Sequence, residues 1–269
     1  MIVKTSHADG CYLCGTDTGV EVFREEPFQA RQCSCGLVYA WPAPADGEVD
    51  PRVDHHHRVY YSQPAALRAN WLRRHLPHGR VLDIGCGEGE FAQAALARGY
   101  EVEGIDPSEP RALIAERRTG ICVHRGLIED DALAPQSYDG VFHVDLLSHF
   151  PDPVASLKAI HHALKPGGMM CFEVGLFAGL SPGWRKLAGR GNMPAHRWFY
   201  EEGSLRALLD RAGFELVEMK YFSIGLSTAI TSLGLKLFRP REISDGATML
   251  HRPVVRGRLG GLYYRAQMW

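Results

Sequence analysis

The hydrophobic positions of the chain follow two alternating periods from residue 80 to residue 174. Short apolar runs predict buried strands, and segments with apolar residues at every third or fourth position predict helices between them. This alternation is typical of βαβ units, in which parallel strands form one sheet with helices on both faces. The predicted elements are strand Arg80–Ile84, helix Glu88–Arg98, strand Tyr100–Ile105, helix Pro107–Arg118, strand Ile121–Arg125, strand Tyr138–Leu146, helix Pro153–Leu164 and strand Gly168–Val174.

The segments before residue 80 and after residue 174 have different residue patterns. Residues 1–42 contain few periodic hydrophobic runs and have Cys and Gly at short intervals. Trp41–Arg58 is a Pro-rich polar linker. Val59–Leu76 has the apolar spacing of a helix. We therefore predict a small module at 1–42, a linker and leading helix at 43–78, and a main domain at 79–269. Its later elements are predicted as helix Glu202–Ala212, strand Phe214–Tyr221, an apolar helical piece Leu226–Phe238 and strand Gly261–Met268.

Composition narrows the range of partners. The chain has 269 residues, 45% of them hydrophobic, and a formal net charge of −1, which is enough for one substantial core and a small module. It has no basic field that would attract nucleic acid, so no nucleic-acid partner is expected. Its apolar stretches are interrupted by Ser, Thr and Gly, so we expect a soluble, cytoplasmic protein without membrane association.

The stretch VLDIGCGEGEF places three glycines, which have no side chain, after the first predicted strand. In an open α/β sheet the ligand lies at the carboxyl ends of the strands, where glycine allows close approach. The spacing of Gly85, Gly87 and Gly89 fits neither the dinucleotide fingerprint nor the P-loop. Asp83 would repel a pyrophosphate and attract an ammonium or sulfonium group. The loop therefore favours a cationic ligand that resembles an amino acid.

A second acid follows the second predicted strand. In EGIDPS, Asp106 stands where a carboxylate accepts hydrogen bonds from both hydroxyls of a ribose. A nucleoside with a positively charged amino-acid tail describes S-adenosylmethionine (SAM).

Four motifs in this order resemble the class I SAM-dependent methyltransferases: VLDIGCGEG, GIDPS, YDGVFHVDLLSHFPDP and ALKPGGMMCFEV. The segment from His196 to Glu218 and the terminal GGLYYRAQMW also resemble that family. The resemblance implies an α/β, Rossmann-like sheet of seven strands in the order 3-2-1-4-5-7-6, with the last strand antiparallel and helices on both faces. It also implies a set of cofactor-binding residues: Asp83, Gly85, Cys86, Gly87, Gly89, Asp106, Pro107, Leu127, Asp145 and Tyr61.

Some members of this set have structural alternatives. Cys86 is interpreted as a packed loop residue and not as a nucleophile. Tyr60 and Tyr61 resemble tyrosines that close over SAM in the family, or else they are core aromatics. The long segment Gly175–Tyr200 is the predicted lid over the acceptor. Its aromatic and basic residues suit an aromatic or anionic small molecule, and a solvated basic loop explains them equally well.

The catalytic candidates follow from the chemistry of methyl transfer. A sulfonium is already an excellent leaving group, so the enzyme aligns the reactants and excludes water, and a hydroxyl acceptor must lose a proton. His149 is the first candidate for the general base, His196 is the second, and Asp145 lies on the same expected rim of the pocket. The alternative is that His149 fixes the loop or the cofactor and that His196 is a buried polar residue under the lid.

Cysteine spacing predicts a metal site near the amino terminus. Cys-x-x-Cys-Gly at Cys11–Gly15, followed later by CGLVYAWPAP, is similar to the zinc-binding module that precedes some natural-product and deoxysugar methyltransferases. Two thiolate pairs can complete a closed, zinc-ribbon-like structural Zn²⁺ site, and its ligands would be Cys11, Cys14, Cys33 and Cys35. The single residue between Cys33 and Cys35 departs from that family's Cys-x-x-Cys and would strain or weaken the site. The alternative is four reduced cysteines without metal.

Three functions remain open from the sequence. The first is methyl transfer to a small molecule, such as a natural-product or sugar-type metabolite, with oxygen as the favoured acceptor and S-adenosylhomocysteine (SAH) as product. The second is a protein or RNA methyltransferase whose zinc module holds the macromolecule. The third is a SAM-fold partner protein without turnover, which the combination of Asp83, Asp106 and three loop glycines disfavours.

Overall fold

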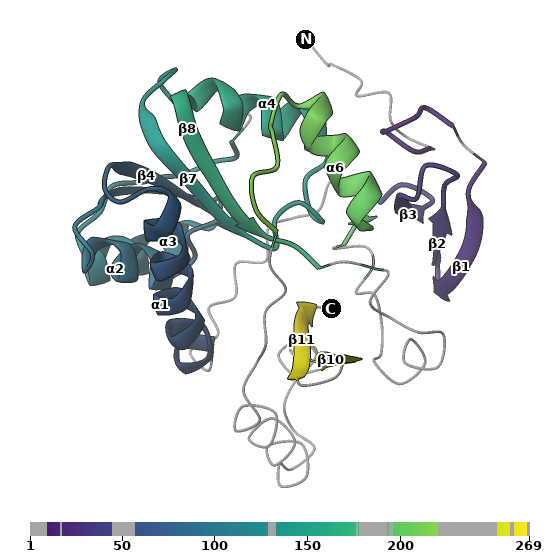
Figure 1. Cartoon of the computed structure of the whole chain (residues 1–269), viewed down its shortest axis with the longest axis horizontal. Coiled ribbons are helices and arrows are strands. Elements are labelled where there is room, and N and C mark those ends of the chain that lie inside the picture. The colour runs from purple at the N-terminus through teal and green to yellow at the C-terminus, as the bar shows by residue number, and fades with distance from the viewer. Residues whose placement is uncertain are drawn as a thin grey trace, which may run out of the picture. The chain divides into compact units, whose positions relative to one another are not determined.

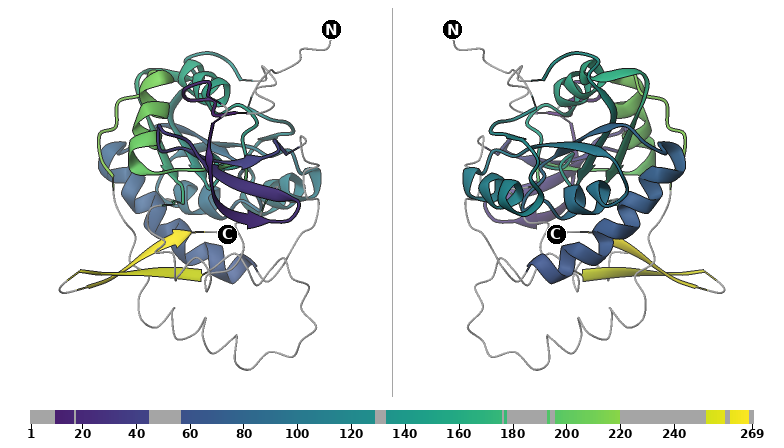
Figure 2. Two further views of the ribbon diagram at one scale, coloured as in Figure 1. Left: turned by 90° about the vertical axis from the view of Figure 1, so that its right-hand side faces the viewer. Right: turned by 90° about the vertical axis from the view of Figure 1, so that its left-hand side faces the viewer.

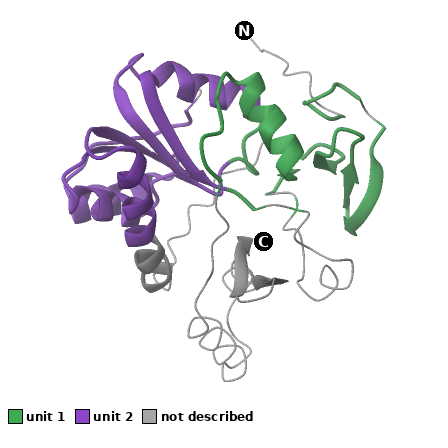
Figure 3. Ribbon diagram, viewed as in Figure 1, with its two compact units in different colours: residues 1–47, 147–151, 174–269 green, residues 48–146, 152–173 purple. Residues whose placement is uncertain are grey.

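The computed structural model of the chain describes residues 10–16, 18–44, 57–128, 133–175, 177, 193, 196–219, 252–258 and 261–267. For 57–64, 252–258 and 261–267 it describes the backbone alone. The chain divides into two compact units (Figure 3). Unit 1 comprises Met1–Gly47, Leu147–Pro151 and Val174–Trp269, and unit 2 comprises Glu48–Leu146 and Asp152–Glu173.

Unit 2 is built on a five-stranded parallel sheet (Figure 1). Its first strand along the chain, β4, lies in the middle and pairs with β5 through Asp83 and Gly104 and with β7 through Val81 and Gly140. The strands in sheet order are β6 (Val123–His124), β5 (Glu101–Ile105), β4 (Arg80–Ile84), β7 (Tyr138–Val144) and β8 (Leu164–Glu173). This arrangement is the 3-2-1-4-5 portion of the predicted order.

Helices cover both faces of this sheet. Val81 and Phe142 belong to a core cluster with residues from α1, α2 and α3, while their neighbours Leu82 and Val141 point to the opposite face and are also fully buried. Because residues on both faces of these strands are buried, helices must cover each face of the sheet. Figure 1 shows α4 on one face and the other three helices on the opposite face. The helices are α1 (His57–His75), α2 (Glu90–Leu96), α3 (Glu109–Thr119) and α4 (Pro153–Ala163).

Local sequence explains where α4 begins. The side chain of Asp152 accepts hydrogen bonds from the amides of Val154 and Ala155, each at 3.0 Å. Pro153 follows at the first helical position, where its missing N–H costs nothing. The PDP motif therefore fixes the end of the 147–151 loop along the chain.

Unit 1 holds a four-stranded antiparallel sheet in the order β1-β2-β3-β9. Its first three strands, coloured purple in Figures 1 and 2, are β1 (Val20–Glu25), β2 (Phe28–Gln32) and β3 (Val38–Trp41), and the fourth, β9 (Trp198–Phe199), comes from far along the chain and leads to α6 (Glu202–Arg211). Phe199 and Phe177 pack with Ala30 and Val38 in one buried cluster. The cysteine-bearing segment thus shares its sheet with Trp198 and Phe199 and its core with Phe177 and Phe199.

Some predicted elements differ from the structure. Residues 214–219, the described part of the strand predicted at Phe214–Tyr221, form no strand, because no described segment pairs with them and an isolated strand has unpaired backbone groups. The final strand, β11 (Gly261–Gln267), pairs with the unpredicted β10 (Arg252–Arg258) in an antiparallel hairpin. The seven-strand order remains a prediction, as do the domain boundaries, and the helical piece at 226–238 lies outside the described residues.

Within the described ranges, none of the helices combines the length and the apolar character needed to cross a bilayer.

Candidate functional site

The glycine loop after β4 adopts a backbone that other residues rarely take. Gly85, Gly87 and Gly89 have φ values of 64°, 56° and 82°, all in the left-handed region that glycine enters without a Cβ penalty. A Cβ on Gly85 would lie 2.9 Å from Leu146 Cδ1, and one on Gly89 would lie 3.0 Å from Thr119 Cγ2. One on Gly87 would meet no atom within 4 Å. The loop therefore combines packed glycines with one glycine that faces open space.

We expect the three glycine positions to differ in their effect on stability. Gly89→Ala should lower the free energy of unfolding by about 2 kcal/mol, since left-handed strain adds to a clash with α3. Gly87→Ala carries the strain alone and should cost about 1 kcal/mol. Gly203→Ala in α6 is the control, because its added Cβ meets nothing and its φ is ordinary. Urea unfolding followed by circular dichroism measures all three, and equal losses for Gly87→Ala and Gly89→Ala would rule out the packing contribution.

Asp106 is fixed by two backbone amides. Its Oδ2 accepts a hydrogen bond from Gly87 N at 2.9 Å, and its Oδ1 accepts one from Ser108 N at 2.8 Å. Burial raises the pKa of this carboxyl group, and the hydrogen bonds from Ser108 and Gly87 oppose that rise. Each oxygen retains a second lone pair for a further donor. Asp106 thus joins the end of β5 to the glycine loop and keeps acceptor capacity.

Asp83 carries an unsatisfied buried oxygen. Its side chain is only 3% exposed, and its Oδ2 has no hydrogen-bond partner among the described residues. Burial raises the pKa of this carboxyl group, the negative charges of Asp106 and Glu90 raise it further, and the positive charge of Arg68 opposes them. An unpaired buried acceptor of this kind costs about 1–3 kcal/mol. A bound cation with N–H donors would remove that cost.

Two further features of unit 2 were not anticipated from the sequence. Arg68 from α1 donates two hydrogen bonds to Glu173 at the end of β8, at 2.8 and 2.6 Å. The hydroxyl of Ser108, next to Asp106, is buried and has no hydrogen-bond partner among the described residues. No pattern in the sequence signals the ion pair, because its members lie 105 positions apart. Ser108 was within reach of sequence reasoning, since it follows Asp106 at the start of a helix.

The remaining predicted cofactor residues of unit 2 are Cys86, Pro107, Leu127, Tyr61 and Asp145, the last of which is described below. Cys86 is buried, and burial raises the pKa of its thiol, so no thiolate forms near neutral pH. A Cβ on Gly104 would lie 2.7 Å from its sulfur, which shows how closely Cys86 packs on β5. Pro107 is exposed, and Leu127 is 45% exposed. Tyr61 lies in α1, and its side chain is outside the described residues.

Asp145 follows β7 in a strained conformation. Its φ is 56°, and its amide donates a hydrogen bond to the Glu173 carbonyl at 2.8 Å. Left-handed residues other than glycine cost of order 1–3 kcal/mol and cluster at functional sites. The strained turn therefore marks this end of β7 as a candidate site on conformational grounds.

The two candidate histidines lie together in unit 1. The ring centroids of His149 and His196 are 4.5 Å apart, and the chain segments that carry them are joined by a hydrogen bond from Arg197 N to Ser148 O at 2.8 Å. A third histidine, His143 in β7, is fully buried, and burial lowers its pKa to about 3. His143 therefore stays neutral near pH 7 and does not accept a proton there.

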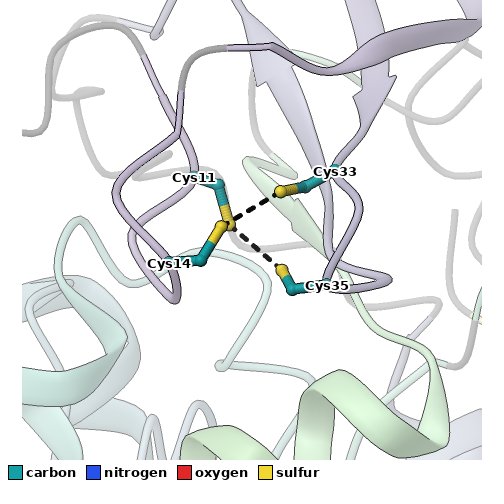
Figure 4. A group of neighbouring side chains, drawn as sticks. All are labelled: Cys11, Cys14, Cys33 and Cys35. Atoms are coloured by element: carbon teal, nitrogen blue, oxygen red, sulfur yellow. Dashed lines mark hydrogen bonds between the residues drawn. The ribbon is translucent and has the colours of Figure 1, made fainter.

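The four amino-terminal cysteines converge (Figure 4). Their sulfur atoms all lie within 4.8 Å of one another, with Cys11 and Cys35 at 3.4 Å and Cys14 and Cys33 at 3.2 Å. All four are free thiols. Four thiolates at about 2.3 Å from a zinc ion lie roughly 3.8 Å from one another, so the arrangement fits a tetrahedral ion. The single residue between Cys33 and Cys35 does not prevent this convergence.

The backbone of each cysteine pair forms a tight turn. Gly15 and Gly36 have φ values of 74° and 86°, and their amides donate to the carbonyls of Cys11 and Cys33 at 2.7 and 2.9 Å. These hydrogen bonds fold each pair back on itself, so both sulfurs of a pair face the same point.

A family model described as a methyltransferase domain matches residues 54–219, which is more than half of the chain. The chain belongs to this methyltransferase family. The matched range includes all the candidate cofactor-binding and catalytic residues and leaves out the four cysteines.

Relatives with known names match part of the chain. The ubiquinone biosynthesis O-methyltransferase of Pseudomonas syringae pv. tomato is 37% identical over 115 residues, covering 40% of this chain and 50% of the relative. The protein of the same name from Pseudomonas putida strain GB-1 gives the same identity and coverage. The chain thus spans about half the length of the curated relatives it matches.

A solved structure agrees with the fold. A SAM-dependent methyltransferase from Archaeoglobus fulgidus has a TM-score of 0.51 and 24% identity, over 65% of this chain and 81% of that one. At this identity the likeness concerns the fold alone. Together with the parallel sheet of unit 2, it confirms the predicted Rossmann-like methyltransferase fold.

Proposed function

We propose that this methyltransferase-family protein transfers the methyl group of SAM to an oxygen of a small-molecule acceptor. The observation that carries the proposal is the buried Oδ2 of Asp83, which has no hydrogen-bond partner in the described part of the chain and lies beside a glycine loop that Asp106 holds in place. An ammonium group bound there would favour the ionised carboxylate and be held by it, whereas a phosphate would be repelled by that ionised form. Membership of the methyltransferase family supports the same ligand.

We assign different residues of unit 2 to different parts of the cofactor. Asp83 accepts from the ammonium group, Asp106 accepts from the ribose hydroxyls, and the backbone of Gly85 and Gly87 faces the amino-acid tail. Arg68 brings a positive charge toward Asp83, as its effect on that carboxyl group indicates. The remaining proposed contacts are with Cys86, Gly89, Pro107, Leu127, Asp145 and Tyr61.

The chemistry asks little of the protein beyond placement and one proton transfer. When bound, SAM would supply a methyl group carried on a sulfonium, and the sulfur would remain in SAH as a neutral thioether. His149 takes the proton from the acceptor hydroxyl, and its ring is placed against His196. His196 is the second candidate for that proton, and Asp145 is a third residue proposed for the reaction. Alignment and exclusion of water supply most of the remaining rate.

The acceptor class rests on the relatives. Those cited are named O-methyltransferases, which supports oxygen as the acceptor atom and a small molecule as the substrate. We propose a natural-product or sugar-type metabolite, as the likeness of the front module suggests. Ubiquinone biosynthesis belongs to those relatives and is not carried over to this chain.

The cysteine cluster is proposed to hold a structural Zn²⁺. Its four sulfurs fit a tetrahedral ion, and with four protein ligands no position remains open for a substrate or water. The ion would therefore act on folding and not on the chemistry.

Two measurements test the function. Calorimetric titration with SAM and SAH should show binding, since both share the ammonium and ribose groups. Labelled methyl from SAM is then offered to an extract that is separated into small-molecule and macromolecular fractions, with heat-killed protein as control. Label in small molecules supports the proposal, and label in protein or RNA contradicts it. Absence of SAH binding would refute the cofactor site itself.

We expect Asp106→Ala to weaken SAH binding by about 10- to 100-fold, since it removes hydrogen bonds to a charged acceptor worth about 1.5–3 kcal/mol. Asp139→Asn is the matched control, because that carboxylate pairs with Lys165 and the Arg80 amide instead. Titration calorimetry measures both variants. Equal affinity of Asp106→Ala and the unmodified protein would remove Asp106 from the site.

A further inference from the structure

The loop at 147–151, which carries His149, is held by backbone acceptors at three of its five residues. The carbonyl of Leu147 accepts from Tyr200 Oη at 3.0 Å, that of Ser148 from Arg197 N at 2.8 Å, and that of Phe150 from Trp198 Nε1 at 2.7 Å. All three donors belong to one short segment, 197–200. The position of His149 within unit 1 therefore depends on that segment. His196 directly precedes the same segment in the chain.

The same segment is tied to the first cysteine turn. The hydroxyl of Tyr12, between Cys11 and Cys14, donates to Tyr200 Oη at 3.2 Å, and its ring packs edge-on against Trp198 with centroids 4.6 Å apart. Tyr12 is 4% exposed and Tyr200 is fully buried. A continuous chain of hydrogen bonds thus runs from the cysteine turn through two hydroxyls to the Leu147 carbonyl.

A cation from α6 fixes the other side of this turn. Arg211 Nη1 donates to the carbonyls of Tyr12 and Leu13, at 3.2 and 2.9 Å. Gln32, next to Cys33, donates through its side chain to Glu201 at 3.1 Å. The first cysteine turn is therefore bonded to Tyr200 and Arg211, and the residue before the second turn is bonded to Glu201, which follows Tyr200 in the chain.

We propose that the cysteine cluster positions His149 and His196 through Tyr12 and Tyr200. This inference rests on the proposed function, because it gives the metal a part in placing the proposed base. The four cysteines would close the turn that carries Tyr12 when they hold the ion, Tyr12 holds the Tyr200 hydroxyl in line with the Leu147 carbonyl, and Tyr200 holds the loop of His149. Tyr12 and Tyr200 are positioning residues, and neither takes part in the chemistry.

The test needs no acceptor. Tyr200→Phe is made in the full chain with histidines labelled for NMR, and the ring resonances of His149 and His196 are compared with those of the unmodified protein. Both should shift by more than their line widths, whereas the resonance of His143, buried in unit 2, should stay in place. Tyr39→Phe is the matched control, since that buried tyrosine of the same sheet accepts from Gly19 N instead. It should leave all three resonances unchanged.

A second variant guards against loss of folding. Tyr12→Phe removes the first hydrogen bond of the chain and leaves the bond from Tyr200 to Leu147, so it should shift the same two resonances by less. Removal of metal with a chelator should shift the same two resonances further than Tyr200→Phe does, because it releases the whole cysteine segment, and added Zn²⁺ should reverse the change. Unmoved His149 and His196 resonances in Tyr200→Phe would overturn the positioning role. SAH titration of the same samples separates the two ideas, because failure to bind SAH would refute the proposed function alone.

Discussion

His149→Ala is expected to lower turnover by about 10²- to 10⁴-fold, which is the usual contribution of a general base. The acceptor is the one identified by methyl labelling. SAH affinity should be unchanged, because the proposed cofactor contacts in unit 2 do not include His149. Turnover and SAH titration are measured on the same preparation, so a split between the two assigns His149 to the chemical step.

Two variants make this result specific. His161→Ala replaces an exposed histidine of α4 and should leave turnover unchanged. His196→Ala tests the second candidate, whose ring lies beside His149. Equal losses of turnover and SAH affinity in His149→Ala would reassign that residue to cofactor binding. A large loss in His196→Ala with a small one in His149→Ala would make His196 the base.

The second large effect is expected at the cysteine cluster. Cys33→Ala should abolish stoichiometric zinc and the folding of the four-stranded sheet in unit 1, because structural zinc contributes about 10–16 kcal/mol to the folding of small zinc domains. The sheet adjoins the cluster directly, since β2 ends at Gln32 and β3 begins at Val38. Metal analysis by mass spectrometry and thermal unfolding measure the two effects.

Cys122→Ala is the matched control for this variant. Cys122 is an exposed free thiol of unit 2, and its loss should change neither the zinc content nor the unfolding temperature. SAH binding should survive in both variants, because the proposed cofactor residues belong to unit 2. Well under one zinc ion per chain in unmodified protein purified without chelator would contradict the metal assignment.

The sequence was sufficient for the parts of the molecule that depend on local rules. Strand β4 has the predicted bounds, Arg80–Ile84, and α4 starts at the predicted Pro153, because strand alternation and helix caps involve residues close in the chain. The glycine loop was predictable for the same reason, since each positive φ is a property of one residue. The convergence of four cysteines followed from two short turns.

Contacts between distant residues could not be predicted in this way. The Tyr12 and Tyr200 hydroxyls lie 188 positions apart, and Arg68 and Glu173 lie 105 positions apart. The sequence of β9 does not indicate that these residues pair with the edge of β3. Which edge accepts a two-residue strand depends on which backbone groups the rest of the fold leaves unpaired.

The sequence by itself thus determined the parallel sheet and the glycine loop, because these arise from hydrophobic periodicity and from the conformational freedom of glycine, while the order of the five strands was implied by the family resemblance. Only the tertiary structure decided that the cysteine segment shares a sheet with residues 198–199 and is linked through the Tyr12 and Tyr200 hydroxyls to the Leu147 carbonyl. The physical reason is that such contacts gain their energy from burial and from hydrogen bonds between segments, and neither is encoded at one position.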